Sequence, residues 1–246
     1  MSQAASTFVP FLENKTALVT GGTSGIGAAI AEGLAAAGAK VIATGVSSQE
    51  VEAARFSGNV EAAVLDVRDG AAVKSLIGEL DRLDVLVNCA GAIRREAEHD
   101  PEVFAQVVDI NLNGSMRCCA AARPVLKRSG GAIVNIASML SFFGGGLVPG
   151  YSASKGGVAQ LTKSLAIAYA ADTIRVNAVA PGWIATPLTR ALQEDHSRSQ
   201  PIIDRTPMKR WGRPDDIAGA VVFLCSPAAA FITGVILPVD GGYLVS

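Results

Sequence analysis

The sequence predicts an α/β protein built on a doubly wound parallel sheet of seven strands with helices on both faces, and three observations lead to this fold. Short apolar runs alternate with helix-forming segments along the chain. Most runs are apolar at consecutive positions, as in residues 16–20, which is typical of strands covered on both faces. The 246 residues also include 26 glycines, which suit many tight strand-to-helix turns. Strict alternation with short turns implies right-handed crossovers between parallel strands.

The elements of the first half follow from local signals. The strand over 16–20 enters a glycine-rich turn, and residues 28–37 form a strongly helical segment that ends at Gly38, a typical C-cap residue. Further along we expect strands over 41–44, 62–67 and 85–87, with helices over 49–55 and 71–80 between them.

The second half continues the alternation. Asp100 and Pro101 form an N-cap and first-turn signal for a helix that we expect to reach about residue 128. Strands are expected over 133–137, 174–180 and 235–239, and helices over 151–171 and from Pro214 onward. Residues 1–13 are expected to be a loosely held lead-in, and residues 183–212 are less regular. Because no linker or repeat divides the chain, we expect one domain over 1–246.

Composition excludes several classes of function. Half of the residues are hydrophobic, 17% are charged and the formal net charge is −1, with the basic residues scattered, so no nucleic-acid or anionic-membrane surface is indicated. The four cysteines have no CxxC spacing and the two histidines are far apart, which argues against a disulfide framework or a metal site. No apolar run is long enough to cross a bilayer, so we expect a soluble cytoplasmic protein.

The stretch from Ser138 to Lys155 carries the strongest chemical signal. Tyr151 and Lys155 are four residues apart, so on a helix their side chains share one face. An ammonium close to a phenol favours the phenolate, which can take a proton from an alcohol or return it to a carbonyl. Ser138 follows an apolar run and is placed to bind the same oxygen. A solvated helix face can carry the same pair, so the triplet alone leaves both readings open.

The turn TGGTSGIG over residues 20–27 lies between a strand and a helix. A dinucleotide pyrophosphate would meet helix N–H groups and the positive dipole end there. Gly21 permits a tight turn, Gly25 lets the backbone approach phosphate, and Gly27 lets the helix pack on the strand. The spacing differs from G-x-G-x-x-G, and any tight strand-to-helix turn favours glycine.

Several motifs in order now point to one family. TGGTSGIG, Leu65-Asp66-Val67, Asn88-Cys89-Ala90-Gly91, Asn111, Ser138, Tyr151-x-x-x-Lys155 and residues 181–186 (PGWIAT) stand at familiar separations. Together they resemble the short-chain dehydrogenase/reductase family in its single-domain form, from about Phe11 to Gly242. The resemblance implies a Rossmann-like fold, NAD(P) as cofactor, and interconversion of a secondary alcohol and a ketone. It also implies that residues 183–212 form a mobile segment that covers the substrate.

The resemblance also implies a role for each matching residue. Tyr151 is the acid/base, Lys155 binds the nicotinamide ribose and lowers the pKa of the tyrosine, and Ser138 orients the substrate oxygen. Asn111 supports a water that links Lys155 to solvent. The diphosphate, adenine, ribose and nicotinamide contacts are expected from Gly21, Ser24, Gly25, Ile26, Gly27, Gly45, Asp66, Val67, Asn88, Ala90, Gly91, Pro181, Gly182, Ile184 and Thr186.

One position departs from the family pattern. Members that prefer NAD carry an acid at the end of the second strand, where this chain has Gly45, followed by Val46. Members that prefer NADP place a basic residue just after that strand or in the glycine turn, where this chain has Val46 and Ser24. The cofactor preference therefore stays open, and our hypothesis is relaxed or dual use.

The expected substrate pocket is apolar, with Arg94, Arg95 and Arg190 as candidate anion partners. We expect an alcohol or ketone of moderate size, with or without a carboxylate. Two alternatives stay open. The first is a 3-oxoacyl-carrier-protein reductase, which Ser129 and Asp172 disfavour and Arg128 and Arg175 support. The second is a cofactor-binding sensor or scaffold without turnover, which the intact Ser138, Tyr151 and Lys155 set disfavours.

Two expectations concern single features. Cys89 is interpreted as a small buried hydrophobe rather than a reactive thiol, because the sequence places no cation beside it. The helices over 101–128 and 151–171 carry alanine-rich outer faces, at Ala120, Ala121, Ala166 and Ala170, and family members use these helices to form dimers. We therefore expect a homotetramer.

Overall fold

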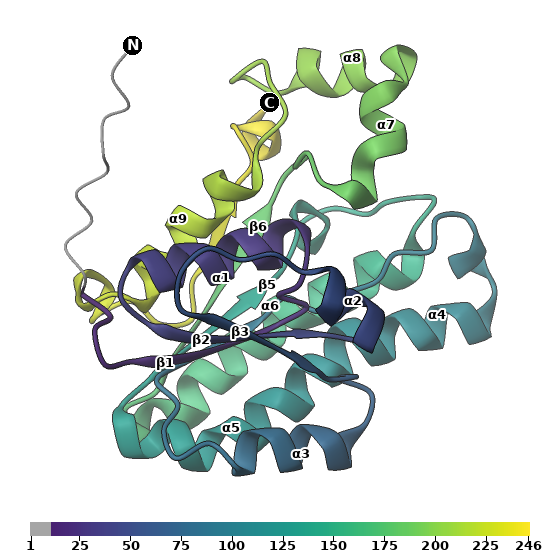
Figure 1. Ribbon diagram of the computed structural model, residues 1–246. Coiled ribbons are helices and arrows are strands. Elements are labelled where there is room, and N and C mark those ends of the chain that lie inside the picture. Colours follow the sequence, from purple (N-terminus) through teal and green to yellow (C-terminus); the bar gives the residue numbers. More distant parts are fainter. Residues whose placement is uncertain (1–10) are drawn as a thin grey trace.

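Seven parallel strands form one sheet, as the sequence predicts, and the structure places them in the order β3-β2-β1-β4-β5-β6-β7 (Figure 1). The computed structural model describes residues 11–246, so most of the expected lead-in over 1–13 lies outside the described residues. The strands are β1 Thr16–Thr20, β2 Lys40–Gly45, β3 Val60–Val64, β4 Val85–Asn88, β5 Ala132–Ile136, β6 Arg175–Pro181 and β7 Ile236–Val239.

Helices cover both faces of this sheet (Figure 1). Strand side chains alternate between the faces, so Leu18 packs into one core while Ala17 and Val19 pack into the other. The longer helices are α1 Gly25–Ala36, α3 Gly70–Gly78, α4 Pro101–Val108, α5 Gly114–Ser129, α6 Pro149–Tyr169 and α9 Pro214–Cys225, and the shorter ones are α2 Ser48–Ala53, α7 Arg190–Glu194 and α8 His196–Arg205. Helices α1 and α9 pack on one face, and α3, α5 and α6 on the other.

The expected helix over 101–128 is interrupted. A π-helical turn over Asp109–Asn113 separates α4 from α5, so one extra residue is accommodated there. The Ser115 hydroxyl donates to the Asn111 carbonyl oxygen at 2.7 Å, a local bond that replaces part of the regular ladder. A Cβ placed at Gly114 would lie 2.6 Å from the Val67 side chain, so the helix passes very close to the loop after β3. The turn brings Asn111 inward, where it is buried.

The third strand ends earlier than the sequence suggests. It covers Val60–Val64 rather than 62–67, so Asp66 and Val67 lie in the loop at the carboxyl end of the sheet. Leu65 still donates its backbone N–H to Gly45, which keeps this loop beside β2. The less regular segment over 183–212 contains α7 and α8, which project from the body near the C-terminus (Figure 1).

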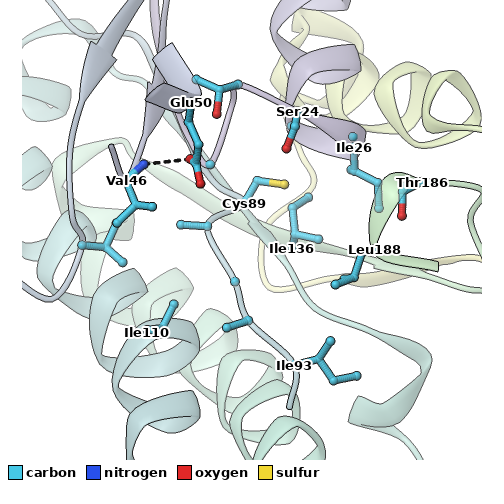
Figure 2. Close-up of a pocket in the computed structure, with 18 of the residues that line it drawn as sticks. Ser24, Ile26, Val46, Glu50, Cys89, Ile93, Ile110, Ile136, Thr186 and Leu188 are labelled. Atoms are coloured by element: carbon cyan, nitrogen blue, oxygen red, sulfur yellow. Dashed lines mark hydrogen bonds between the residues drawn. The ribbon is translucent and has the colours of Figure 1, made fainter. Parts of the chain in front are cut away.

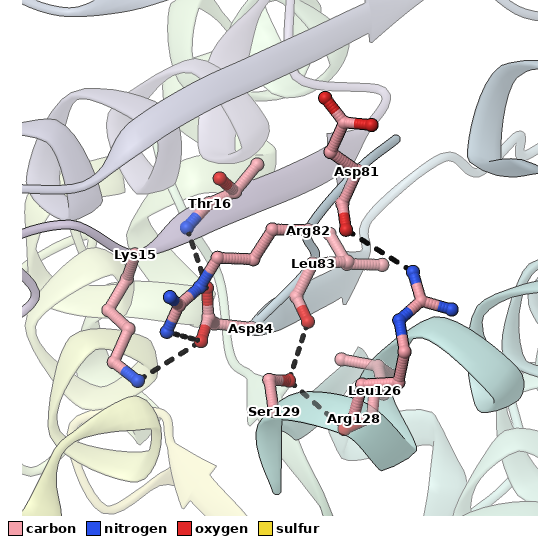
Figure 3. Close-up of polar contacts among 9 residues, drawn as sticks. All are labelled: Lys15, Thr16, Asp81, Arg82, Leu83, Asp84, Leu126, Arg128 and Ser129. Atoms are coloured by element: carbon pink, nitrogen blue, oxygen red, sulfur yellow. Dashed lines mark hydrogen bonds and ion pairs between the residues drawn. The ribbon is translucent and has the colours of Figure 1, made fainter. Parts of the chain in front are cut away.

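A charge cluster closes the amino ends of the strands (Figure 3). The Asp84 carboxylate accepts from Lys15 Nζ at 3.0 Å, from Arg82 Nε at 2.6 Å, and from the Thr16 backbone N–H at 3.0 Å. Burial acts to raise the pKa of Asp84, but these three donors outweigh it and hold the pKa below its usual value. The ionised carboxylate therefore ties the start of β1 to the start of β4.

Within residues 11–246, no helix combines the length and the apolar character that crossing a membrane requires. Over the same residues, no three histidine, cysteine or acidic side chains gather closely enough to hold a metal ion.

Candidate active site

A cleft of about 520 Å³ runs along the carboxyl ends of the central strands (Figure 2). It lies where the strand order reverses between β1 and β4, the place where open α/β sheets bind their ligands. Glu50 and Val46 lie at one end of the cleft, and Ile93 and Leu188 at the other. This volume falls within the range of ordinary ligand sites.

The glycine turn forms one wall of the cleft for steric reasons. Gly21 has φ +62°, and a Cβ placed there would lie 2.7 Å from the Ala90 Cα. A Cβ at Gly27 would lie 2.0 Å from the Gly21 carbonyl oxygen, so neither position tolerates a side chain. Helix α1 starts at Gly25 with no side-chain cap and no acid in its first turn. Its free N–H groups and dipole face the cleft and suit a diphosphate.

The turn after β4 forms the floor of the cleft. The Thr20 hydroxyl accepts from the backbone N–H groups of Cys89 and Ala90, both at 3.2 Å, and holds this turn against β1. The Asn88 side chain points into the sheet, where it donates to Asn135 Oδ1 at 2.8 Å. Asn88 thus positions the turn from below and does not line the cleft.

Tyr151 and Lys155 lie together on α6, as their spacing predicts. Lys155 Nζ is 5.6 Å from the centre of the Tyr151 ring and donates to the Ile136 carbonyl oxygen at 2.6 Å. Only 5% of Lys155 is exposed. Ser138 is buried beside them, and its side chain forms a hydrogen bond with that of Tyr151. The structure therefore brings together the three side chains that the sequence predicts to be catalytic.

The pKa values of this pair differ from the sequence expectation. The pKa of Tyr151 is raised, because burial outweighs the hydrogen bond from Ser138 that lowers it. Burial also lowers the pKa of Lys155 from 10.5 to about 8. The prediction that the pKa of Tyr151 is lowered is therefore wrong for this structure. A neutral phenol beside an amine that is mostly protonated at neutral pH is suited to donate a proton to a carbonyl oxygen.

Asn111 connects two walls of the site from its π-helical turn. Its Oδ1 accepts from the Ala92 N–H at 2.8 Å, and its Nδ2 donates to the Ala92 carbonyl and to the Ser154 hydroxyl, both at 3.0 Å. The amide is therefore engaged by the protein itself and fixes the loop after β4 against α6. The water that the family resemblance implies beside Asn111 stays a prediction.

The other expected cofactor residues fall into two groups. Those that line the cleft are Gly21, Ser24, Gly25, Ile26, Gly27, Asp66, Val67, Ala90, Gly91 and Thr186, together with Tyr151 and Lys155. The residues Gly45, Pro181, Gly182 and Ile184 are not among those that line the cleft. Ile184 is buried in the core, and Gly182 packs so closely on Asp240 that a Cβ would lie 2.7 Å from its Cα.

The structure adds a residue that the sequence analysis missed. Glu98 is 1% exposed, and its two carboxylate oxygens accept from the backbone N–H groups of Arg94 and Tyr151, each at 2.7 Å. A usable signal was present, because α6 begins after Val148, which offers no capping side chain. A helix start without a local cap requires a partner from elsewhere, and Glu98 is that partner.

Other groups at the two ends of the cleft are polar. At one end Arg68 donates to both carboxylate oxygens of Asp66, and this hydrogen bonding lowers the pKa of Asp66. At the other end Arg94 lines the cleft, whereas Arg95 and Arg190 do not. Cys89 is half-buried and lines the cleft, and Lys155 lies close enough to act to lower its pKa, contrary to the expectation that no cation stands beside it. Burial outweighs this effect and raises the pKa of Cys89 to about 11, so the thiol is not activated.

Known proteins resemble this chain along nearly its full length. A family model described as enoyl-(acyl carrier protein) reductase matches residues 21–244. A 2-dehydro-3-deoxy-D-gluconate 5-dehydrogenase from Bacillus subtilis is 46% identical over 243 residues, which cover 95% of this chain and 96% of the relative. The enzyme of that name from Escherichia coli is 40% identical, with 95% and 96% covered.

Solved structures agree with these relatives. An Agrobacterium tumefaciens protein, described as a proposed 2-deoxy-D-gluconate 3-dehydrogenase with bound NADP, superposes with a TM-score of 0.88 at 46% identity. The match covers 96% of this chain and 99% of that one. A gluconate 5-dehydrogenase from Burkholderia cenocepacia, in complex with NADP and tartrate, gives a TM-score of 0.90 at 34% identity, with 97% and 98% covered.

Proposed function

Because this chain belongs to the short-chain dehydrogenase/reductase family, we propose that it interconverts a secondary alcohol and a ketone on a sugar acid whose carboxylate binds Arg94. The chain is an NAD(P)-dependent oxidoreductase acting on CH–OH groups, since relatives at 40% and 46% identity over nearly its full length are dehydrogenases. The sensor or scaffold alternative is therefore set aside. The substrate class and the residue roles are the proposal.

The position of Arg94 carries the substrate proposal. Arg94 lines the same cleft as Tyr151 and Lys155, and its backbone N–H is fixed by the buried Glu98. Among the residues that the structure describes, no carboxylate forms an ion pair with its guanidinium, which donates only to the Ile93 carbonyl at 3.3 Å. An exposed, unpaired guanidinium at the mouth of a cleft suits a carboxylate, which it binds through two parallel hydrogen bonds. Several relatives act on gluconate derivatives, which carry such a group.

The polar groups of α6 and its surroundings then perform the proton chemistry. When bound, the nicotinamide cofactor supplies the carbon that gives or accepts hydride. Ser138 holds the substrate oxygen in line, and Tyr151 donates its phenolic proton to that oxygen in reduction or takes it back in oxidation. Lys155 has one carbonyl partner at 2.6 Å, so its remaining N–H donors are available to the ribose hydroxyls of the cofactor.

The acyl-carrier-protein reductase alternative is weakened by the contacts of its supporting arginines. Arg175 donates to the Leu224 carbonyl at 2.8 Å and to the Ile232 carbonyl, so its guanidinium is used inside the protein. Arg128 donates to the Asp81 carbonyl at 3.2 Å. Asp172 presents a carboxylate held by Arg123 and Lys127 where a docking arginine would be needed. Of the two arginines that support this alternative, only Arg128 is exposed, and it forms no ion pair within the described residues, so it alone keeps its charge for an acidic carrier protein.

Three features complete the proposal. We propose that the chain folds as one domain and that α7 and α8 close over the substrate. We also propose a homotetramer, supported by exposed Ile167 on α6 and exposed Phe231 before β7. Light scattering should then give about four times the chain mass of 25.2 kDa. A cytoplasmic location is supported by the free cysteines Cys89, Cys118, Cys119 and Cys225.

Substitution of Arg94 tests the substrate class. We expect Arg94→Gln to lower kcat/KM for gluconate-type acids by about 10- to 100-fold, the size of a lost charge-assisted hydrogen bond pair. Activity on a neutral polyol such as galactitol should change by less than about threefold, within ordinary mutational variation. Turnover is followed by nicotinamide absorbance at 340 nm.

The neighbouring arginine supplies the matched control. Arg95→Gln removes the same charge from the same loop, but Arg95 does not line the cleft, so it should leave both substrates unaffected. Equal losses on the acid and the polyol in Arg94→Gln, or a wild-type preference for the polyol, would rule out the proposed substrate class.

A further inference from the structure

A carboxylate from α2 occupies the place that Gly45 leaves open at the end of β2. A Cβ placed at Gly45 would lie 3.0 Å from Glu50 Oε2 and 2.9 Å from Thr23 Oγ1. Glu50 lines the cleft together with Val46, and Figure 2 shows its side chain beside the end of β2. The family pattern predicts such an acid at position 45 itself, where this chain has glycine. The acid missing there is supplied five residues later.

Local structure fixes this carboxylate in place. Ser47 caps α2 by accepting from the Glu50 backbone N–H at 3.3 Å. The Glu50 side chain reaches back past the cap, and its Oε2 accepts from the Val46 N–H at 3.0 Å. The pattern Ser47-x-x-Glu50 is thus a variant of the capping box, in which the acid binds the residue before the cap. One carboxylate oxygen is used in this bond, which leaves Oε1 with its lone pairs available.

The charge of Glu50 is not balanced within this end of the cleft. Arg68 is the cation of the lining there, and its guanidinium is committed to Asp66 through contacts of 3.0 Å from Nε and 2.6 Å from NH2. That pair is neutral overall. The other lining cations of the described chain, Arg94 and Lys155, lie with Ile93 and Tyr151 at the opposite end. The field at the β2 end is therefore negative.

We propose that Glu50 makes this enzyme selective for NAD over NADP. The cofactor's adenosine ribose meets the end of β2 in this family, so Glu50 Oε1 would accept a hydrogen bond from its hydroxyl groups. A 2′-phosphate at the same place carries up to two negative charges and would be repelled. The inference rests on the family's use of NAD(P) and replaces the expectation of relaxed use that Gly45 alone suggested. It concerns this chain's own Glu50, since the related Agrobacterium structure holds NADP.

A matched pair of nucleotides tests the inference without turnover. We would measure the binding of 5′-AMP and of adenosine 2′,5′-bisphosphate by calorimetry, because the two ligands differ only in the 2′-phosphate. The wild-type protein should bind 5′-AMP at least about tenfold more tightly, the equivalent of about 1.4 kcal/mol. Glu50→Gln keeps an oxygen for the Val46 N–H and removes the charge, so the bisphosphate should gain about tenfold in affinity.

The control lies on the same helix. Glu52 is exposed and does not line the cleft, so Glu52→Gln removes the same charge from α2 and should leave the ratio of affinities unchanged. The effect of Glu50→Gln should also shrink in about 0.5 M salt if it acts through charge.

Two results would overturn the inference. One is a wild-type protein that binds the bisphosphate as tightly as 5′-AMP, and the other is a Glu50→Gln variant that behaves like Glu52→Gln. Because nucleotide binding requires no alcohol or ketone, a protein that selects 5′-AMP but oxidises no sugar acid would refute the proposed substrate and leave this inference standing.

Discussion

Asp84 and Lys155 are buried charged side chains at opposite edges of the sheet, and the two edges treat them in opposite ways. At the amino edge Asp84 is 4% exposed and accepts hydrogen bonds from Lys15, Arg82 and Thr16 (Figure 3). At the carboxyl edge Lys155 is 5% exposed and donates to the Ile136 carbonyl, its one hydrogen-bond partner among the described residues. One edge satisfies its charge fully and the other leaves donors free.

The pKa values record this difference. The pKa of Asp84 is lowered, so the folded protein favours its charged form. The pKa of Lys155 is also lowered, to about 8, which means that folding disfavours its charged form. The shift from 10.5 corresponds to about 3 kcal/mol of destabilisation at neutral pH. The amino edge therefore contributes stability, whereas burial of Lys155 at the carboxyl edge costs stability, as expected if its charge serves the proposed cofactor contact.

The largest expected effect tests whether activity resides at the carboxyl edge alone. Tyr151→Phe removes the proton donor and should lower kcat by about 10²- to 10⁴-fold, the usual contribution of a general acid–base. Tyr169→Phe is the matched control on α6, because Tyr169 is buried against Arg123 and lies away from the cleft. The initial rate of nicotinamide absorbance change measures both. A Tyr151→Phe variant that retains wild-type kcat would refute the role assigned to Tyr151.

The next effect tests whether the amino edge serves stability. Asp84→Asn keeps the shape but removes the charge, and it should lower the free energy of unfolding by about 2–3 kcal/mol because Lys15 and Arg82 lose their partner. Urea unfolding gives the loss, and kcat at a temperature below the transition should stay near wild type. Asp81→Asn is the control, since only the backbone carbonyl of Asp81 accepts a hydrogen bond from Arg128. A drop in the kcat of Asp84→Asn without a loss of stability would refute the proposal that the amino edge serves stability and not activity.

The smallest expected effect on stability concerns Lys155 and its dependence on pH. Lys155→Met should abolish most activity yet raise the free energy of unfolding at pH 7 by about 1–3 kcal/mol, because a buried charge is removed. The folded pKa of about 8 lies below the unfolded value of 10.5, so the unfolded chain binds more protons between these values. The destabilisation caused by charged Lys155 therefore decreases as the pH rises from about 8 to 10.5, and the free energy of unfolding increases.

The pH experiment measures the difference in the free energy of unfolding between Lys155→Met and the wild-type protein at each pH. The stability advantage of Lys155→Met over wild type should shrink between pH 7 and pH 10, measured by urea unfolding. Buried thiols such as Cys119 act in the opposite direction but are common to both proteins. Lys163→Met, on the exposed face of α6, should show no such trend. A Lys155→Met protein less stable than wild type at pH 7 would show that Lys155 supports the fold.

The same contrast explains what could be predicted from the sequence. The glycine turn and the closeness of Tyr151 to Lys155 depend on short-range spacing, so they were predicted correctly from patterns. The strand order depends on pairing between distant segments, such as β1 with β4, and was not predicted. Glu98 accepts a hydrogen bond from the backbone N–H of Tyr151, 53 residues away in the sequence. Glu50 accepts one from the Val46 N–H in the turn before its own helix. Nothing in their own surroundings separates Glu98 from the nearby acids Glu96 and Glu102. The π-helical turn at Asp109–Asn113 was missed because it depends on close packing of Gly114 against Val67.

Glu98 also has a consequence for which molecules fit. One buried carboxylate holds the backbone of Arg94 and the backbone of Tyr151, with 2.7 Å to each. If Arg94 binds the carboxylate of a substrate, Glu98 limits how far the Arg94 backbone can move relative to Tyr151. The distance between the bound carboxylate and the reacting carbon would then be restricted by this shared contact. The enzyme would then select substrates by the number of carbons between the carboxylate and the reacting hydroxyl group, and would exclude substrates in which this number is larger or smaller.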